Sequence, residues 1–188
     1  MYKRSPTGEA FCPDGAIDAP QHVPPRSTQH SLIIFIAIFI ALQWGWSAAR
    51  GSWLERLVVH QATVVPAAAL VRLLTPAIPA QAVAASIKAP GGGLNILNGC
   101  EGTEVMFLLA AALAAVRLPG RQRTIALLLG VGLIFLLNQA RILTLFYTFR
   151  ADRSLFDALH TAVLPVLLVA ATAAYFYAVL HYSQRRLA

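Results

Sequence analysis

The sequence predicts an all-α integral membrane protein, a bundle of about four transmembrane helices with an interfacial helix and a long outer loop. Of its 188 residues, 57% are hydrophobic and only 12% are charged, whereas soluble domains carry roughly 25% charged residues. Four apolar runs approach or exceed the ~20 residues that a helix needs to cross a ~30 Å hydrocarbon core. A chain of this length leaves no room for a second folded domain.

The N-terminal region differs in composition from the rest of the chain. Residues 1–30 are polar, lack apolar periodicity and contain five prolines (Pro6, Pro13, Pro20, Pro24 and Pro25). This composition predicts a disordered cytoplasmic tail. The remainder, residues 31–188, is expected to form one membrane-embedded domain. Its first apolar run, residues 31–49, predicts an uncleaved membrane anchor.

Residues 51–74 are apolar on average, but polar side chains interrupt them (Glu55, Arg56, His60, Gln61 and Arg72). Because the apolar residues recur at helical spacing, this pattern favours an interfacial helix over a span. Prolines and glycines then crowd residues 76–93, which predicts the long outer loop. Three further spans are expected at residues 99–116, 124–149 and 155–182.

The positive charges predict the orientation of the chain. Lys and Arg are concentrated in the tail, in the short turn at residues 117–123 and at the C-terminal end, which the positive-inside rule places in the cytoplasm. The net charge of +7 therefore has a topological explanation. We expect a lipid bilayer and no nucleic acid as the partner of these charges.

The chain has two cysteines, Cys12 and Cys100, which this topology places on opposite sides of the membrane. No cysteine or histidine spacing indicates zinc, so no metal and no cofactor are expected. Asn98 can cap a helix that Glu101 supports as in a capping box, which would put Cys100 in the first helical turn. Such a thiol is a candidate nucleophile, although a small residue at a helix start is also common packing.

Arg141 lies about 17 residues into the third expected span, ~25 Å from its inner end at 1.5 Å per residue. An ionisable residue at that depth is a functional hypothesis by default. Asn138, three positions earlier, lies on the same helix face. The alternative is that Arg141 only extends toward the outer headgroups.

His160 lies near the outer end of the fourth expected span, after the plausible capping sequence Ser154-Leu155-Phe156-Asp157. Pro165 cannot donate to the carbonyl of Thr161, so we expect a kink beside His160. Asp157, three residues before His160, is a candidate for orienting the imidazole, although such an acid is more often only a cap.

Cys100, Arg141 and His160 share the outer side of the membrane in this topology. A thiolate can attack a carbonyl, a guanidinium can stabilise the oxyanion, and an imidazole can act as general acid and base. The three residues together therefore predict acyl-transfer chemistry.

These residues resemble the core of the exosortase/archaeosortase family of membrane cysteine transpeptidases. The resemblance covers roughly residues 94–173 and rests on Asn98-Gly99-Cys100-Glu101-Gly102, Asn138-Gln139-Ala140-Arg141 and His160. It implies that Cys100 is the nucleophile, with Arg141 and His160 as its partners, in a transpeptidase-like domain. The implied substrates are exported proteins with a C-terminal tail of short motif, transmembrane helix and basic end, processed at the outer (periplasmic) face of a bacterial inner membrane.

The sequence departs from the family pattern in two ways. Fewer spans precede the cysteine, and Glu-Gly-Thr-Glu follows Cys100 where a Ser-Gly type is common. Two other functions remain open at this point. One is a non-catalytic membrane subunit or small transporter that holds an anion on Arg141. The other is a membrane acyltransferase with Cys100 as its acyl carrier.

Overall fold

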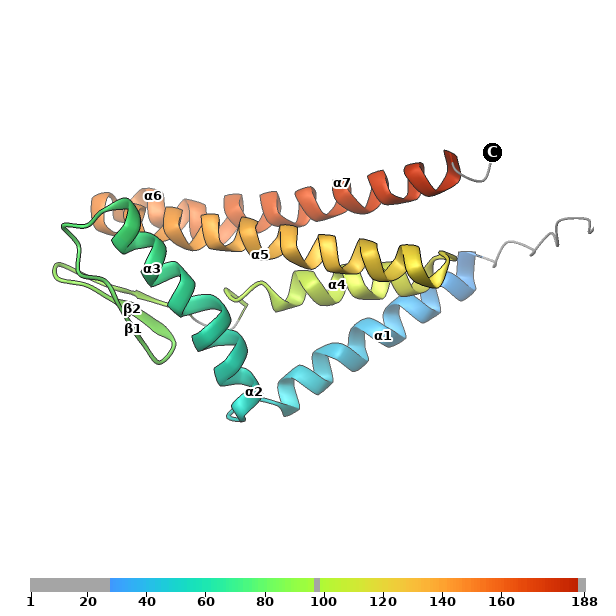
Figure 1. The fold of residues 1–188 in the computed structure, drawn as a ribbon, viewed down its shortest axis with the longest axis horizontal. Helices are drawn as coiled ribbons and strands as arrows, with labels where there is room; N and C mark the ends of the chain where they lie inside the picture. The colour runs from blue at the N-terminus through green and yellow to red at the C-terminus, as the bar shows by residue number, and fades with distance from the viewer. Residues whose placement is uncertain (1–27, 97–98, 186–188) are drawn as a thin grey trace, which may run out of the picture.

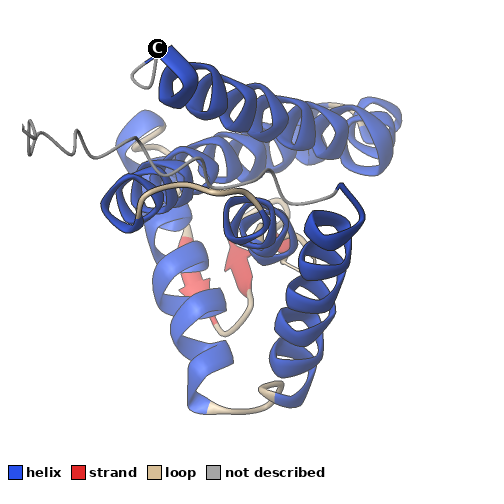
Figure 2. Ribbon diagram, turned by 90° about the vertical axis from the view of Figure 1, so that its right-hand side faces the viewer, coloured by secondary structure: helices blue, strands red, loops and turns tan. Residues whose placement is uncertain are grey.

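The computed structural model describes residues 28–96 and 99–185, and most of them are helical (Figures 1 and 2). This confirms the predicted all-α membrane class. The helical elements are α1 (Thr28–Ala48), α2 (Trp53–Glu55), η1 (Arg56–Val64), α3 (Val65–Leu74), α4 (Thr103–Ala115), α5 (Gly120–Ala151), α6 (Arg153–Ala158), η2 (Leu159–Val163) and α7 (Leu164–Arg185), where η marks a π-helix. Helix α1 includes the last three residues of the expected tail, residues 28–30, and the rest of the tail lies outside the described residues.

Four helices in the described part of the chain are long and apolar enough to cross a membrane: α1, Trp53–Leu74, α5 and Arg153–Arg185. The predicted number of membrane-spanning helices is thus correct, but residues 53–74 replace the predicted span at residues 99–116 among the four. Helix α4 has 13 residues, about 20 Å of helix, which is short of a ~30 Å core. Residues 53–74 have the length of a span, and their interfacial location stays a prediction because length alone does not place them.

Helices α4, α5 and α7 lie side by side and form the centre of the bundle (Figures 1 and 2). Helix α1 packs against α4, and the chain then turns so that α1 and α3 form a V, with α3 reaching the far end of α5. The central helices bury a common apolar cluster (Leu109, Leu113, Leu118, Ala126, Ile134 and Leu168). Helix α5 is therefore the scaffold on which both halves of the molecule pack.

Close packing among these three helices depends on Gly130. A Cβ atom there would collide with Leu109 on α4 and come within 2.8 Å of the Tyr175 ring on α7, whereas Gly132 has nothing within 4 Å. We expect Gly130→Ala to cost about 1–3 kcal/mol of unfolding free energy by overpacking. Thermal unfolding in detergent should show a lower midpoint for Gly130→Ala than for Gly132→Ala. Equal midpoints would contradict this packing.

Residues 76–96 are not simply a loop, contrary to the expectation. They form an antiparallel sheet of β1 (Gln81–Val83), β2 (Ser86–Lys88) and β3 (Leu94–Asn95) in the order β1-β2-β3. Its inner face buries Ile87, Leu94 and Ile96 against α5. Arg150 near the end of α5 donates to the carbonyls of Pro90 and Gly92, at 2.8 and 3.0 Å. The sheet is thereby fixed over the C-terminal end of α5.

Both π-helices end two residues before a proline. Segment η1 ends at Val64, before Val65 and Pro66, and η2 ends at Val163, before Leu164 and Pro165. A proline inside an α-helix donates no hydrogen bond, and its ring clashes with the carbonyl four residues earlier. Here the preceding N–H groups bond five residues back, from Val65 to His60 and from Leu164 to Leu159. Beside His160, where we expected a kink, the helix contains a π turn, a feature often found at functional sites.

Candidate functional site

Cys100 lies in a non-helical segment, residues 99–102, that leads into α4. The expectation that it occupies the first helical turn is wrong, because α4 begins at Thr103. Gly99 and Gly102 adopt φ values of +90° and +80°, a left-handed conformation that glycine allows and that interrupts a helix. Asn98, the expected cap, lies outside the described residues.

Glu101 is buried and does not form the expected capping box. Its carboxylate accepts hydrogen bonds from Trp46 Nε1 on α1 at 3.3 Å and from Thr103 Oγ1 at 3.2 Å. A buried carboxylate is costly unless donors satisfy it. The Trp46 contact therefore ties the segment that carries Cys100 to the end of α1.

Asn138 on α5 holds the same segment from the other side. Its Nδ2 donates to the backbone carbonyl of Cys100 at 3.1 Å, and a Cβ at Gly102 would lie 3.1 Å from the Asn138 side chain. Non-helical backbone at membrane depth is tolerated only where protein or a wet cavity covers it. Asn138 therefore satisfies the backbone carbonyl of Cys100, the candidate nucleophile, which is a contact that a supporting role would use.

Arg141 is one helical turn further along α5 and is only 8% exposed. Its Nη2 donates toward the Sγ of Cys100 at 3.9 Å, and its buried Nε has no hydrogen-bond partner within the described ranges. The side chain thus points at the thiol. A guanidinium N–H next to the sulfur is placed to meet the oxygen of a carbonyl that the sulfur attacks.

His160 lies on η2 and stacks on the Phe156 ring, with centroids 5.3 Å apart and the planes inclined by 6°. Its buried Nδ1 has no partner among the described residues. Asp157 is exposed, and no hydrogen bond joins it to His160 among the described residues, so its orienting role stays a prediction. Asp152, not the Ser154–Asp157 sequence, provides the cap: it accepts from the N–H groups of Ser154 and Leu155.

The structure brings Cys100, Arg141 and His160 together as the shared lining of two cavities. The larger cavity, about 430 Å³, continues along the apolar side chains of Val105, Leu168 and Val169. The smaller cavity, about 170 Å³, lies under β3 and is lined by Leu94, Asn95, Ile96, Ile142, Leu145 and Phe156.

Glu104 also lines the larger cavity, although no pattern in the sequence indicated a role for it. It lies in the first turn of α4 and lines the same cavity as Cys100.

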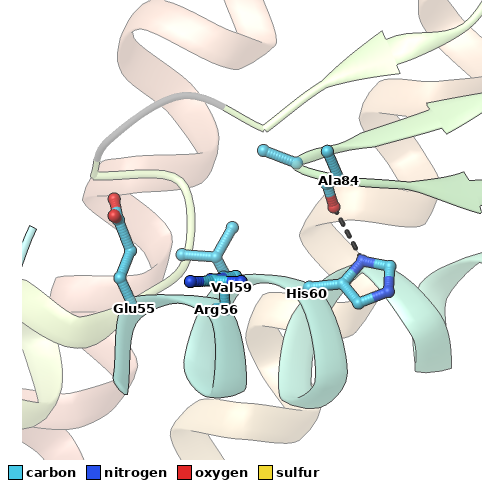
Figure 3. Close-up of a pocket in the computed structure, with 6 residues that line it drawn as sticks. Glu55, Arg56, Val59, His60 and Ala84 are labelled. Atoms are coloured by element: carbon cyan, nitrogen blue, oxygen red, sulfur yellow. Dashed lines mark hydrogen bonds between the residues drawn. The ribbon is translucent and has the colours of Figure 1, made fainter. Parts of the chain in front are cut away.

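Another cavity, about 330 Å³, lies between η1 and the β1–β2 turn (Figure 3). There His60 Nδ1 bonds to the carbonyl of Ala84 at 2.8 Å. No thiol lines this cavity, and His60 serves there to hold the β1–β2 turn against η1.

A family model described as transmembrane exosortase matches residues 68–178. This range is more than half of the chain and contains Cys100, Arg141 and His160. The chain belongs to the exosortase family. Membership supports a membrane exosortase-type function in general terms. Neither a curated protein nor a solved structure matches this exosortase, so the assignment of its residues depends on the geometry above.

Proposed function

We propose that this exosortase is a membrane-embedded thiol protease and transpeptidase that cleaves the C-terminal sorting tails of exported proteins and transfers them to an acceptor. One observation carries the proposal: the Arg141 guanidinium lies 3.9 Å from the Cys100 sulfur, and His160 lines both cavities beside them. A thiol, an oxyanion donor and an acid/base from three separate segments are the parts that acyl transfer requires.

The proposed reaction has two halves. The Cys100 thiolate attacks the scissile carbonyl carbon, and Arg141 stabilises the oxyanion. The C–N bond then breaks, His160 protonates the leaving amine, and the exported protein is left as a thioester on Cys100. An acceptor amine, hydroxyl or water attacks the thioester and gives its proton to His160, and the C–S bond breaks to release the Cys100 thiolate.

The location of the site supports processing at the outer face of a bacterial inner membrane. Cys100, Arg141 and His160 lie nearer the β-sheet end of α5 than the end at Arg121 and Arg123, which the positive-inside rule assigns to the cytoplasm. A substrate tail with a transmembrane helix and a basic end would fit this orientation, because its basic end would stay inside. Residues 31–188 are proposed as the transpeptidase-like domain.

Trapping the thioester tests the proposal directly. Purified protein would be mixed with a tail-derived peptide and quenched in acid, and the peptide that contains Cys100 would be examined by mass spectrometry. We expect a mass increase equal to the acyl part of the substrate, lost on treatment with hydroxylamine. Tail cleavage with no acyl group on Cys100 would show that another nucleophile acts.

The rival function, an anion-binding transporter or scaffold, makes different use of Arg141. It needs the guanidinium but not the thiol, and the contact between Arg141 and Cys100 would then have no purpose. The acyl-carrier alternative needs Cys100 but no peptide substrate. Acylation of Cys100 by the tail-derived peptide distinguishes the proposed function from both alternatives.

A further inference from the structure

Strand β3 is an edge strand that lies beside the candidate site. The opposite edge of the sheet, β1, contacts η1 and α3, and His60 fixes the β1–β2 turn there (Figure 3). Strand β3 pairs only with β2 within the described sheet, through Ser86 with Asn95 and Ile87 with Leu94. Its outer edge therefore has no neighbouring strand.

The register determines which backbone groups lie on that edge. Ile96 donates to the carbonyl of Ala85 at 2.8 Å, so Ile96 and, two residues earlier, Leu94 direct their backbone groups at β2. Alternate residues of an antiparallel strand face opposite sides of the ladder. The N–H and C=O of Asn95 consequently point away from β2. Asn95 is also exposed, which leaves these groups accessible to a peptide.

The cavity under this edge belongs to the site. Asn95 lines the 170 Å³ cavity together with Cys100, Arg141 and His160, and the rest of its lining is mostly apolar. A cavity of about 150 Å³ can hold a benzene molecule, so this space has room for one apolar side chain. In an added strand, side chains alternate between the two faces, so only every second residue would point at this cavity.

We propose that the substrate segment next to the scissile bond binds in extended form as a fourth strand on β3, with one apolar side chain in the cavity under the strand. Asn95 would donate to one substrate carbonyl and accept from one substrate N–H. Main-chain bonds of this kind give affinity, while the cavity gives specificity. This inference depends on the proposed function, because it describes how that reaction would hold its peptide.

The test uses peptide electrophiles and needs no natural substrate. Acetyl-Ala-Val-Ala vinyl sulfone would be compared with analogues carrying a single N-methyl group on each residue in turn, using the full chain in detergent. The Cys100 sulfur adds to the β carbon of the vinyl group, and the α carbon takes a proton. Iodoacetamide labelling, which needs no peptide contact, reports the reactivity of the thiol itself.

We expect an alternating pattern in the labelling rates. N-methylation should slow labelling at least about tenfold where the N–H faces Asn95, and less than about twofold at the neighbouring residue. Replacing the residue that points at the cavity by Asp should also slow labelling at least about tenfold. Equal sensitivity at successive residues, or none at any, would overturn strand addition. If iodoacetamide labelled Cys100 but no peptide electrophile did, both strand addition and the proposed function would be refuted. If the peptides labelled Cys100 but N-methylation gave no alternating pattern, only strand addition would be refuted.

A protein variant gives an independent measurement. Asn95→Pro removes the outward N–H, which edge strands tolerate because that group is not used by the sheet, whereas Asn95→Ala keeps it and serves as the matched reference. Peptide labelling of Asn95→Pro should be at least about tenfold slower than that of Asn95→Ala, with equal iodoacetamide rates. Equal peptide rates in the two variants would contradict the proposal. If iodoacetamide also labelled Asn95→Pro more slowly than Asn95→Ala, the slower peptide labelling would result from a misplaced thiol and not from the lost N–H.

Discussion

Cys100→Ala should abolish tail cleavage, with a rate loss of at least about 10⁴-fold, the scale expected when the nucleophile of a covalent enzyme is removed. Cys100→Ser should be nearly as inactive, because a hydroxyl is a much weaker nucleophile than a thiolate unless a base activates it. The measurement is the ratio of cleaved to intact tail in cells that produce a tagged exported protein with a motif, a transmembrane helix and a basic end.

The matched control for this experiment is Cys12→Ser, which removes the only other cysteine of the chain. It should leave cleavage within about twofold of the unmodified protein, since Cys12 lies in the polar N-terminal region. Membrane extracts should contain equal amounts of all variants. Normal cleavage by Cys100→Ala at equal abundance would rule out the thiol mechanism and favour the scaffold or transporter.

The sequence was sufficient to predict the helical membrane class because hydrophobic runs are a direct consequence of the bilayer thickness. It also predicted that Cys100, Arg141 and His160 lie together, since the expected topology places each of them toward the same side of the membrane. Their contacts could not be predicted. The 3.9 Å approach of Arg141 to Cys100 depends on how α5 packs against the start of α4, and no periodicity in the sequence contains that information.

The wrong predictions have identifiable physical causes. Asn98 and Glu101 fit a capping pattern, but two left-handed glycines at positions 99 and 102 delay the helix to Thr103. Glu101 is then buried, where the distant Trp46 satisfies it. Tertiary contact outweighed a local signal in that case.

The sheet at residues 81–95 was missed for a related reason. Its strands have only two or three residues each, too few for an alternating pattern to stand out between prolines and glycines. Their stability comes from the cover that α5 and Arg150 provide, which depends on residues more than 50 positions away. Short strands of this kind become visible only when the chain is folded.

Arg141→Met should reduce the cleavage rate by about 10²–10³-fold, the loss typical of removing one oxyanion donor. Arg141→Lys should recover only part of that activity, because an ammonium keeps the charge but lacks the planar fork of the guanidinium. The effect should appear mainly in kcat, since an oxyanion exists only in the transition state and the tetrahedral intermediate. Single-turnover cleavage of a tail-derived peptide in detergent would measure it.

Stability separates this role from a structural one. The buried Arg141 has an Nε with no partner in the parts of the chain that the structure describes, and burying such a group is costly. Arg141→Met should therefore unfold at the same temperature as the unmodified protein or higher, even though it cleaves the tail far more slowly. A residue kept for function at the expense of stability behaves in this way. The control is Arg153→Gln at the start of α6, where the exposed Arg153 covers the Phe149 ring; this variant should keep full activity. An Arg141→Met protein that lost activity only in proportion to its loss of folded protein would show that the guanidinium supports the fold and not the reaction.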